Sequence, residues 1–375
     1  MRARFGTAGN PEGFYAAGKK QSKQMPGWLR ERGLDAYEYQ CGKGVTVGEA
    51  TARAIGQAAA QAGIALSLHA PYFVNPANPE PDSQAKTAGY VLAACRVARW
   101  MGADRVVVHT GAIQKRTRQA ALATARQCFR TLRHRCDEEG YQDILLCPET
   151  MGKINQLGDL EEVLTLCTEA EGLLPCVDFG HLYARSLGAL DGPEAVERML
   201  DQMVRELGVA RASQFHSHFS KIAYTPRGGE ARHLTFDQPD FGPDPAPLCE
   251  ALARRGWSPR VICESAGTQD VDALWMKGPI SGPWGDGGGL RREKSKENPQ
   301  ESPWGGEIPL QKSERYCKIE NAYGIKAARF AALPAGLPKG ACRGCQPSAG
   351  RRYGNFVWRM KNYDFCRRIS EWRYL

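Results

Sequence analysis

The feature that most constrains the fold is a regular alternation of short apolar β-type runs with longer amphipathic helical runs, which continues to Lys277. Eight strands are predicted, at 3–7, 36–41, 65–69, 105–109, 144–149, 175–179, 213–219 and 260–264. Helical runs lie between them, at 48–62, 83–101, 117–139, 159–171, 192–207 and 244–255. A glycine follows most of these runs, as is typical where a helix stops. This pattern predicts an α/β fold, the (β/α)8 TIM barrel, with functional groups at the carboxyl ends of its strands.

The alternation ends abruptly after Lys277. A last helix is expected from about Asp270 to Lys277, where a Gly-Pro pair stops it after two turns. Of the chain's 50 Lys/Arg and 41 Asp/Glu, 18 and 9 lie from residue 278 on, so residues 1–277 carry 32 of each sign. We therefore expect a neutral barrel domain at 1–277. The basic, Gly/Pro-rich tail at 278–375 is either a disordered nucleic-acid arm or, as we favour, a non-native extension.

Composition restricts where such a protein can work. No apolar run approaches the roughly 20 residues that cross a bilayer, and the first residues lack the apolar core of a signal peptide. The 13 cysteines are scattered through predicted strands and helices, which favours reduced thiols over a disulfide framework. We expect a cytoplasmic monomer with no membrane partner.

Histidines and carboxylates follow the predicted strands, at the end where a barrel would bring them together. Imidazole and carboxylate together suit Zn²⁺, Mn²⁺ or Fe²⁺ better than Ca²⁺ or Mg²⁺. The candidate metal ligands are His69, His109, Glu149, Asp178, His181, His216, Glu230, His233 and Glu264. One ion takes three or four protein ligands, so this number indicates two or three ions with a bridging carboxylate. Such a centre can lower the pKa of a water and neutralise phosphate charge, which suits phosphodiester hydrolysis.

Several short motifs, in order and spacing, resemble the endonuclease IV family of metal-dependent apurinic/apyrimidinic endonucleases. They are Leu68–Asn75 with Ala77–Pro79, Val108–Gly111, Pro148–Gly152, Asp178–His181 and Cys263–Ser265. The resemblance spans about 3 to 277 and implies a TIM barrel. It also implies a first ion held by His69, His109 and Glu149, and a second bridged by Glu149 and held by Asp178, His216 and Glu264. A third would be held by His181 and His233 with a nearby carboxylate.

The sequence departs from the family pattern in three places. Ala231 stands where the family has an Asp two residues before the last His, which leaves Glu230 as the nearest carboxylate. The loop at 39–44 and the run at 151–156 also differ from the family's DNA-contacting loop and small-residue run. These departures indicate a divergent member whose third metal site is altered.

Residues near the ligands have both functional and structural interpretations. Tyr72 and Phe73 follow the first ligand and would stack against an unstacked nucleotide, or else anchor a loop on the rim. His218 shares a strand face with His216 and would support a ligand or contact phosphate, with a structural role at even odds. Lys221 and Arg232, with Arg227 nearby, would bind phosphate, although exposed basic residues are common. His134 lies in a charged helical run and is expected to be a surface residue.

Together these features predict a hydrolase that cleaves DNA 5′ to abasic sites during base excision repair. Its cofactor would be two or three Zn²⁺, with Mn²⁺ or Fe²⁺ as alternatives, and no organic cofactor is expected. Glu149 would be the catalytic bridge. The alternative is a metal-dependent sugar isomerase or epimerase of the related xylose-isomerase-like barrels, which the many histidines disfavour. A third possibility is a metal-stabilised barrel left inactive by a shortened last helix.

Overall fold

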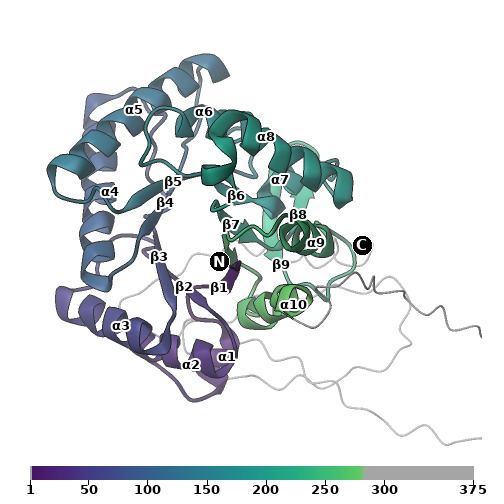
Figure 1. Ribbon diagram of the computed structural model, residues 1–375. Helices are drawn as coiled ribbons and strands as arrows, with labels where there is room; N and C mark the ends of the chain where they lie inside the picture. Colours follow the sequence, from purple (N-terminus) through teal and green to yellow (C-terminus); the bar gives the residue numbers. More distant parts are fainter. Residues whose placement is uncertain (1, 282–375) are drawn as a thin grey trace, which may run out of the picture. The chain divides into compact units, whose positions relative to one another are not determined.

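A computed structural model describes residues 2–281, which contain a closed barrel of eight parallel strands (Figure 1). The strands neighbour one another in the order β1-β10-β7-β6-β5-β4-β3-β2. Their bounds are β1 Arg4–Ala8, β2 Ala36–Gln40, β3 Ala65–His69, β4 Arg105–His109, β5 Leu145–Glu149, β6 Cys176–Asp178, β7 His216–Phe219 and β10 Arg260–Cys263. Each lies within a predicted strand or extends it by one residue, so the TIM barrel prediction is confirmed.

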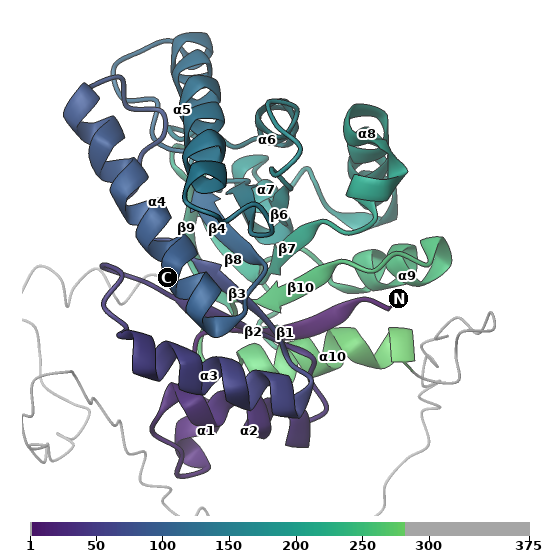
Figure 2. The same ribbon diagram turned by 60° about the vertical axis from the view of Figure 1, so that its left-hand side comes forward.

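Helices cover the outside of the barrel, as the views in Figures 1 and 2 show. The principal ones are α3 Glu49–Ala62, α4 Pro81–Met101, α5 Arg118–Glu138, α6 Leu160–Cys167, α8 Gly192–Ala212, α9 Ala246–Arg255 and α10 Gln269–Ser281. Gly63, Gly102 and Gly256 end helices in the left-handed conformation, the role expected of them. No helix among the described residues has the length and apolar character needed to cross a membrane.

Several elements were not predicted, and one prediction was wrong. The missed elements are too short for a helical period or interrupt the βα repeat: α1 Glu12–Ala16, η1 Ser22–Gln24, α2 Met25–Glu31, α7 Phe179–Arg185 and the hairpin of β8 Lys221–Thr225 and β9 Gly229–Leu234. The last helix does not stop at Lys277 but continues to Ser281. Burial of Ala273 and Met276 against the barrel outweighs the local Gly-Pro signal. The remaining tail, 282–375, lies outside the described residues.

Because side chains alternate along each strand, large apolar ones face the surrounding helices, and small or polar ones face the barrel axis. Residues such as Phe5, Tyr37, Leu68, Val106 and Phe215 face outward into the main core under the helices. The inward positions hold two small apolar clusters: Ala8, Ala36, Ala65 and Ile262, and Val107, Cys147, Leu174 and Cys176. Because side chains alternate with a period of two, the polar residues two positions further along these strands also face inward. The barrel interior therefore becomes polar toward the carboxyl ends of its strands.

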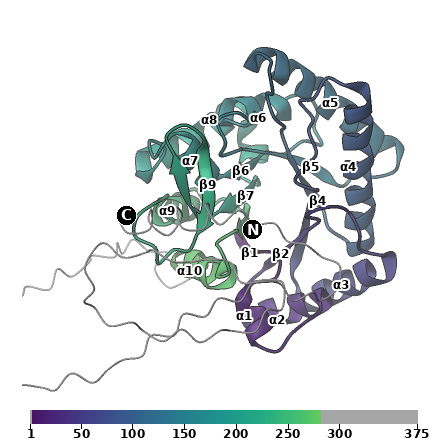
Figure 3. The ribbon, with the colours of Figure 1, turned by 180° about the vertical axis from the view of Figure 1, so that it is seen from behind.

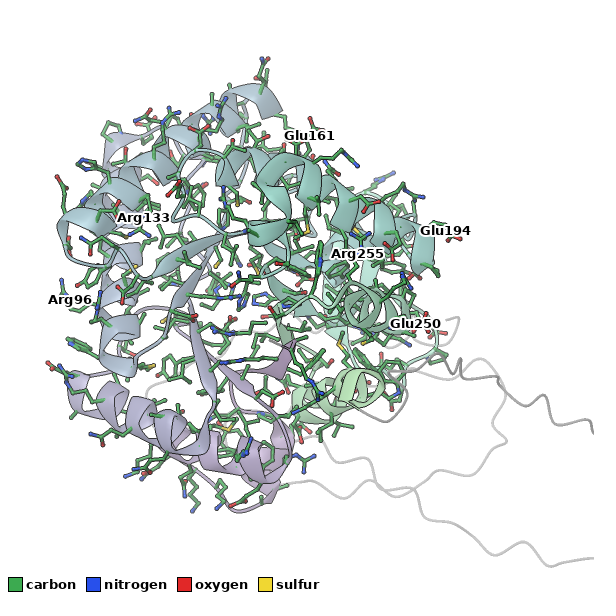
Figure 4. All side chains as sticks on the ribbon, viewed as in Figure 1. Arg96, Arg133, Glu161, Glu194, Glu250 and Arg255 are labelled. Carbon is green, nitrogen blue, oxygen red and sulfur yellow. The ribbon has the colours of Figure 1, made fainter. Side chains whose placement is uncertain are left out.

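Buried arginines close the amino-terminal end of the barrel. Arg260 donates from Nη1 to the carbonyl of Leu66 and to Asp104, both at 2.8 Å. Arg105 donates from Nη1 to the carbonyl of Phe215 at 3.3 Å. Figure 4 shows side chains filling the centre of the ring, while charged residues such as Glu161, Glu194 and Glu250 lie on the outer helices and are exposed. The interior is thus packed with side chains rather than open as a pore, with apolar clusters between the arginines at one end and the histidines and carboxylates at the other.

Close packing of β1 against β2 makes Gly6 a sensitive position. A Cβ atom there would lie 1.8 Å from the carbonyl oxygen of Ala36. Overpacking of this kind costs about 1–3 kcal/mol, occasionally more. Gly6→Ala should therefore lower the urea midpoint of unfolding. Gly89→Ala, at an open and exposed position of α4, should leave it unchanged or raise the free energy of unfolding by up to about 1 kcal/mol. Equal midpoints for Gly6→Ala and the unmodified protein would contradict this packing.

Candidate metal centre

The first group of candidate ligands comes from three neighbouring strands. His69, His109 and Glu149 end β3, β4 and β5. Both imidazoles aim Nε2 at the same carboxylate oxygen, Oε2 of Glu149, at 3.1 and 3.3 Å. Their Nδ1 atoms lie 2.8 and 3.0 Å from the carbonyls of Ala70 and Tyr72. Donation from Nδ1–H to a carbonyl makes Nε2 the nitrogen that a metal ion would take once the imidazole is neutral.

A second group lies on the other side of Glu149. Glu149, Asp178, His218 and Glu264 each offer one ligand atom, and these atoms all lie within 4.8 Å of one another. His218 Nδ1 is 2.9 Å from Oε1 of Glu149 and 3.7 Å from Oε1 of Glu264. Glu149 thus directs one oxygen to each group, which is the geometry of a bridging carboxylate.

The third group does not come from the barrel strands. His181 lies in the first turn of α7, and Glu230 and His233 lie on β9. These three residues are also within 4.8 Å of one another, and His181 Nε2 is 3.5 Å from Oε2 of Glu230. A Cβ at Gly152 would come within 2.6 Å of the Glu230 Cβ, so only glycine lets the hairpin approach this closely. The hairpin and α7 lie in front of the barrel in Figure 3.

The structure places His218 where the sequence analysis expected His216. Both side chains face inward because they are two residues apart on β7. His216 lies one step deeper, where its Nε2 is 2.9 Å from Oε2 of Glu38, and it is absent from the group around Glu149. His218, expected to support a ligand or contact phosphate, reaches the Glu149 group instead. The two-residue alternation of β7 predicts that both histidines face inward. It does not predict which of them lies level with the carboxylates of Glu149, Asp178 and Glu264.

Glu38 is the buried residue that the sequence analysis missed. It lies on β2 and is 0% exposed. Its oxygens accept hydrogen bonds from Ser67 Oγ, His216 Nε2 and His218 Nε2, each at 2.9 Å, and from Gln40 Nε2 at 3.1 Å. The available signal was a charged residue at an inward position of the short run Ala36–Gln40, two residues after an interior alanine.

Buried charges determine the protonation of the site. Burial alone would raise the pKa of Glu149 and of Glu38, but in both cases the charge of His218 and imidazole hydrogen bonds hold the pKa well below its ordinary value. Burial alone would lower the pKa of His69, but the hydrogen bond and charge of Glu149 raise it to about 9. Burial lowers the pKa of His216 to about 4, so this imidazole is neutral.

Asp178 is the observation that best tests whether a cation fits. Its Oδ1 accepts the backbone N–H of His181 at 2.7 Å, whereas the buried Oδ2 accepts no hydrogen bond and has His181 Nδ1 at 3.2 Å as its ion-pair contact. Burial raises the pKa of Asp178, and the charges of Glu264 and Glu149 raise it further against the opposing charge of His181. A buried oxygen that accepts no hydrogen bond, among three converging carboxylates and beside a single imidazole, is costly unless a cation joins them. The residues present therefore fit a divalent metal ion held by imidazole and carboxylate.

The predicted substrate-binding residues lie at the rim. Tyr72 and Phe73, on the loop after β3, are 55% and 43% exposed and meet edge to face, and Phe73 meets Tyr90 in the same way. The Lys221 ammonium donates to the carbonyl of Gln238 at 2.6 Å, and Arg232 is exposed on β9. The aromatic pair is thus presented to solvent beside the first ligand.

Comparison with known proteins identifies the superfamily. The xylose isomerase-like TIM barrel family matches residues 26–280. The chain belongs to this family. It is 30% identical over 273 residues to uncharacterized protein MJ0133 of Methanocaldococcus jannaschii, covering 73% of this chain and 95% of that protein. It is 27% identical over 190 residues to probable endonuclease 4 of Nitratidesulfovibrio vulgaris, covering 50% of this chain and 66% of that protein.

Solved structures agree on the fold. Endonuclease IV from Thermus thermophilus superimposes with a TM-score of 0.51 at 18% identity, covering 73% of this chain and 97% of that one. A D-tagatose 3-epimerase-like protein superimposes with a TM-score of 0.51 at 19% identity, covering 65% and 86%. The superfamily is one of enzymes that typically bind metals, and within it the chain resembles endonuclease IV as a divergent relative.

Metal ions should stabilise the folded chain. Saturating Zn²⁺ at 100 times its dissociation constant adds about 2.7 kcal/mol to the free energy of unfolding. Thermal unfolding should therefore shift upward with Zn²⁺ and downward with a chelator. Asp178→Asn, which removes the negative charge and puts an amide NH₂ in place of one carboxylate oxygen, should remove most of the shift. Asp143→Asn, on an exposed side chain, should retain it. An equal shift in both variants would contradict the assignment of Asp178.

Metal binding should also release protons. Burial alone would lower the pKa of His181, but the charges of Asp178, Glu230 and Glu149 raise it to about 9, the value that His69 also has. Both imidazoles are protonated at pH 7 and must lose the proton to act as ligands, so affinity should rise with pH from 7 to 9 and then level off. Calorimetric titration with Zn²⁺ in two buffers of different ionisation enthalpy measures the release. Heats that do not depend on the buffer would count against it.

Proposed function

We propose that this chain is a metal-dependent phosphodiester hydrolase that cleaves DNA 5′ to abasic sites. The observation that carries the proposal is the bridging geometry of Glu149, with an imidazole-rich group on one side and a carboxylate-rich group on the other. Divalent metal ions, with Zn²⁺ as the first choice, would supply the activation of water and the neutralisation of phosphate charge that hydrolysis needs. The name of the Nitratidesulfovibrio vulgaris relative adds support.

The candidate ligands would hold three ions in three groups. His69, His109 and Glu149 would hold the first ion, and Asp178, His218 and Glu264 would hold the second with Glu149. His181, Glu230 and His233 would hold the third. Glu230, three residues before His233, would replace the aspartate that the family has at the position of Ala231. This arrangement of charges around a central carboxylate would position a phosphate between the groups.

The rim residues would bind the nucleic acid around the target. Tyr72 and Phe73 are exposed beside His109 and would stack where an abasic site leaves a gap in the duplex. Arg232 is available to a phosphate, whereas Lys221 would first have to release the carbonyl of Gln238. Binding through exposed basic residues of an overall neutral barrel predicts a modest salt dependence.

One observation favours the alternative of a sugar isomerase or epimerase. The group around Glu264 contains three carboxylates and one imidazole, which is the kind of ligand set that a single-ion isomerase uses. The ratio of metal to protein separates the two functions. Elemental analysis of the full chain should give close to three ions for the nuclease and one for the isomerase.

Glu149→Gln should abolish nicking of an abasic-site duplex. The amide cannot bridge two cations, and a displaced cation would take with it several kcal/mol of transition-state charge stabilisation, so the rate should fall by roughly 100-fold or more. The metal content of the variant should fall as well. The measurement is the initial rate of nicking on a labelled duplex with one abasic site, at saturating Zn²⁺.

His134→Ala provides the control, because His134 is an exposed residue of α5 that contacts only Glu138 among the described ion pairs. It should change neither the nicking rate nor the metal content. Nicking by Glu149→Gln within tenfold of the unmodified rate would rule out a bridging role. Absence of nicking by the unmodified chain, with one ion bound, would redirect the search to sugar substrates.

A further inference from the structure

A further buried carboxylate, that of Glu38, lies below the candidate metal centre. Both of its oxygens accept hydrogen bonds, whereas Oδ2 of Asp178 accepts none. Glu38 accepts four hydrogen bonds, two on each oxygen: His218 and Gln40 on Oε1, Ser67 and His216 on Oε2. These donors come from β2, β3 and β7, on both sides of the barrel axis. Both oxygens of this buried carboxylate are therefore fully hydrogen-bonded to protein groups.

We propose that Glu38 is the positioning residue of the metal centre, holding His218 so that its Nδ1 faces Glu149, Asp178 and Glu264. A carboxylate accepts hydrogen bonds and does not donate them, and Glu38 is too deep to bind the ion itself, so Nε2 of His218 keeps its proton when a metal ion binds. The ring then gives up the proton of Nδ1, and the Nδ1 lone pair is the one that it offers to an ion beside Glu149. The inference rests on the metal centre proposed above but not on its substrate.

The geometry supports a directed role rather than simple packing. Nε2 of His218 is 2.9 Å from Glu38 Oε1, and Nδ1 of the same ring is 2.9 Å from Glu149 Oε1. The ring is therefore held at both ends between two buried carboxylates. It also stacks on His69 at a centroid distance of 5.7 Å, which restricts rotation about its remaining torsion. Carboxylate–imidazole–metal arrangements of this type orient the ligand and raise its basicity.

His216 has a supporting role in this arrangement. It donates from Nε2 to Glu38 Oε2, while its Nδ1 is buried without a partner. Cys176, His216 and His218 do lie within 4.8 Å of one another. However, both imidazoles already use Nε2 toward Glu38, and His218 uses Nδ1 toward Glu149. The deeper residues therefore form the support for one ligand rather than a separate ion site.

The direct test is the Zn²⁺ affinity of Glu38→Gln in the full chain, measured by competition with a chelator of known affinity. Glutamine preserves the volume but offers one oxygen to several donors, and its amide group would face an N–H. Loss of such a supporting partner lowers metal affinity about 10- to 100-fold. One class of Zn²⁺ should weaken by this factor, while the ion held by His181, Glu230 and His233 keeps its affinity.

Glu169→Gln is the matched control. Its carboxylate is also buried and accepts from two partners, Arg126 and Arg130, but it follows α6 at the opposite end of the barrel. It should leave Zn²⁺ affinity unchanged even if it lowers stability. Zn²⁺ affinities of Glu38→Gln and Glu169→Gln within twofold of the unmodified chain would overturn the proposal.

A measurement on the unmodified protein covers the case in which Glu38→Gln does not fold. In the Zn²⁺-loaded chain labelled with ¹⁵N-histidine, His218 should show a slowly exchanging proton on Nε2 and none on Nδ1, a signal missing from His218→Asn. A proton on Nδ1 would overturn the proposal. Loss of nicking on abasic DNA with an intact Nε2 signal would overturn the proposed substrate and leave the role of Glu38 standing.

Discussion

Buried carboxylates on the barrel axis are the constraint on which the rest of the site depends. Glu38 and Glu149 are almost wholly buried, and an isolated carboxylate in that position would be too costly to remain charged. Imidazoles from β3, β4 and β7 surround them and offset the cost. The barrel can hold these rings because β1, β2 and β3 direct small residues inward, among them Gly6, Ala8, Ala36, Ala65 and Ser67. Small residues at the inward positions of these strands thus leave room for the large polar side chains on the barrel axis.

Sequence predicted the barrel well because each strand and helix repeats a local pattern. Buried parallel strands are short apolar runs, and the glycines after α3, α4 and α9 mark helix ends through their left-handed backbone. The hairpin β8–β9 was missed because it interrupts the repeat with an antiparallel pair that lies outside the barrel sheet. The end of α10 was misjudged because burial of Met276 against the barrel, which a local pattern does not report, sustains the helix.

The sequence predicted which residues gather at the site, but not how far along the barrel axis each one lies. Eight of the nine proposed ligands lie in three groups, each within 4.8 Å, or contact Glu149 directly, as His109 does. His216 is the exception, because a period of two assigns it and His218 to one face without saying which reaches the carboxylates. Glu38 was not predicted because it lies two residues before the end of β2, whereas the predicted ligands lie at or just after strand ends. Its role depends on partners 29, 178 and 180 residues away in the chain.

The barrel alone supplies the first two groups of candidate ligands, whereas the third depends on segments added to it. His181 needs α7, and Glu230 and His233 need the hairpin, which reaches the 151–158 loop through a bridge between Lys153 and Gly229. Arg185 ties that loop down by donating to the carbonyls of Met151 and Lys153 at 3.2 and 2.9 Å. A barrel without the hairpin would keep the imidazole-rich and the carboxylate-rich groups on the two sides of Glu149. With α7 and the hairpin, two further imidazoles and the carboxylate of Glu230 form a third group of candidate ligands beside it.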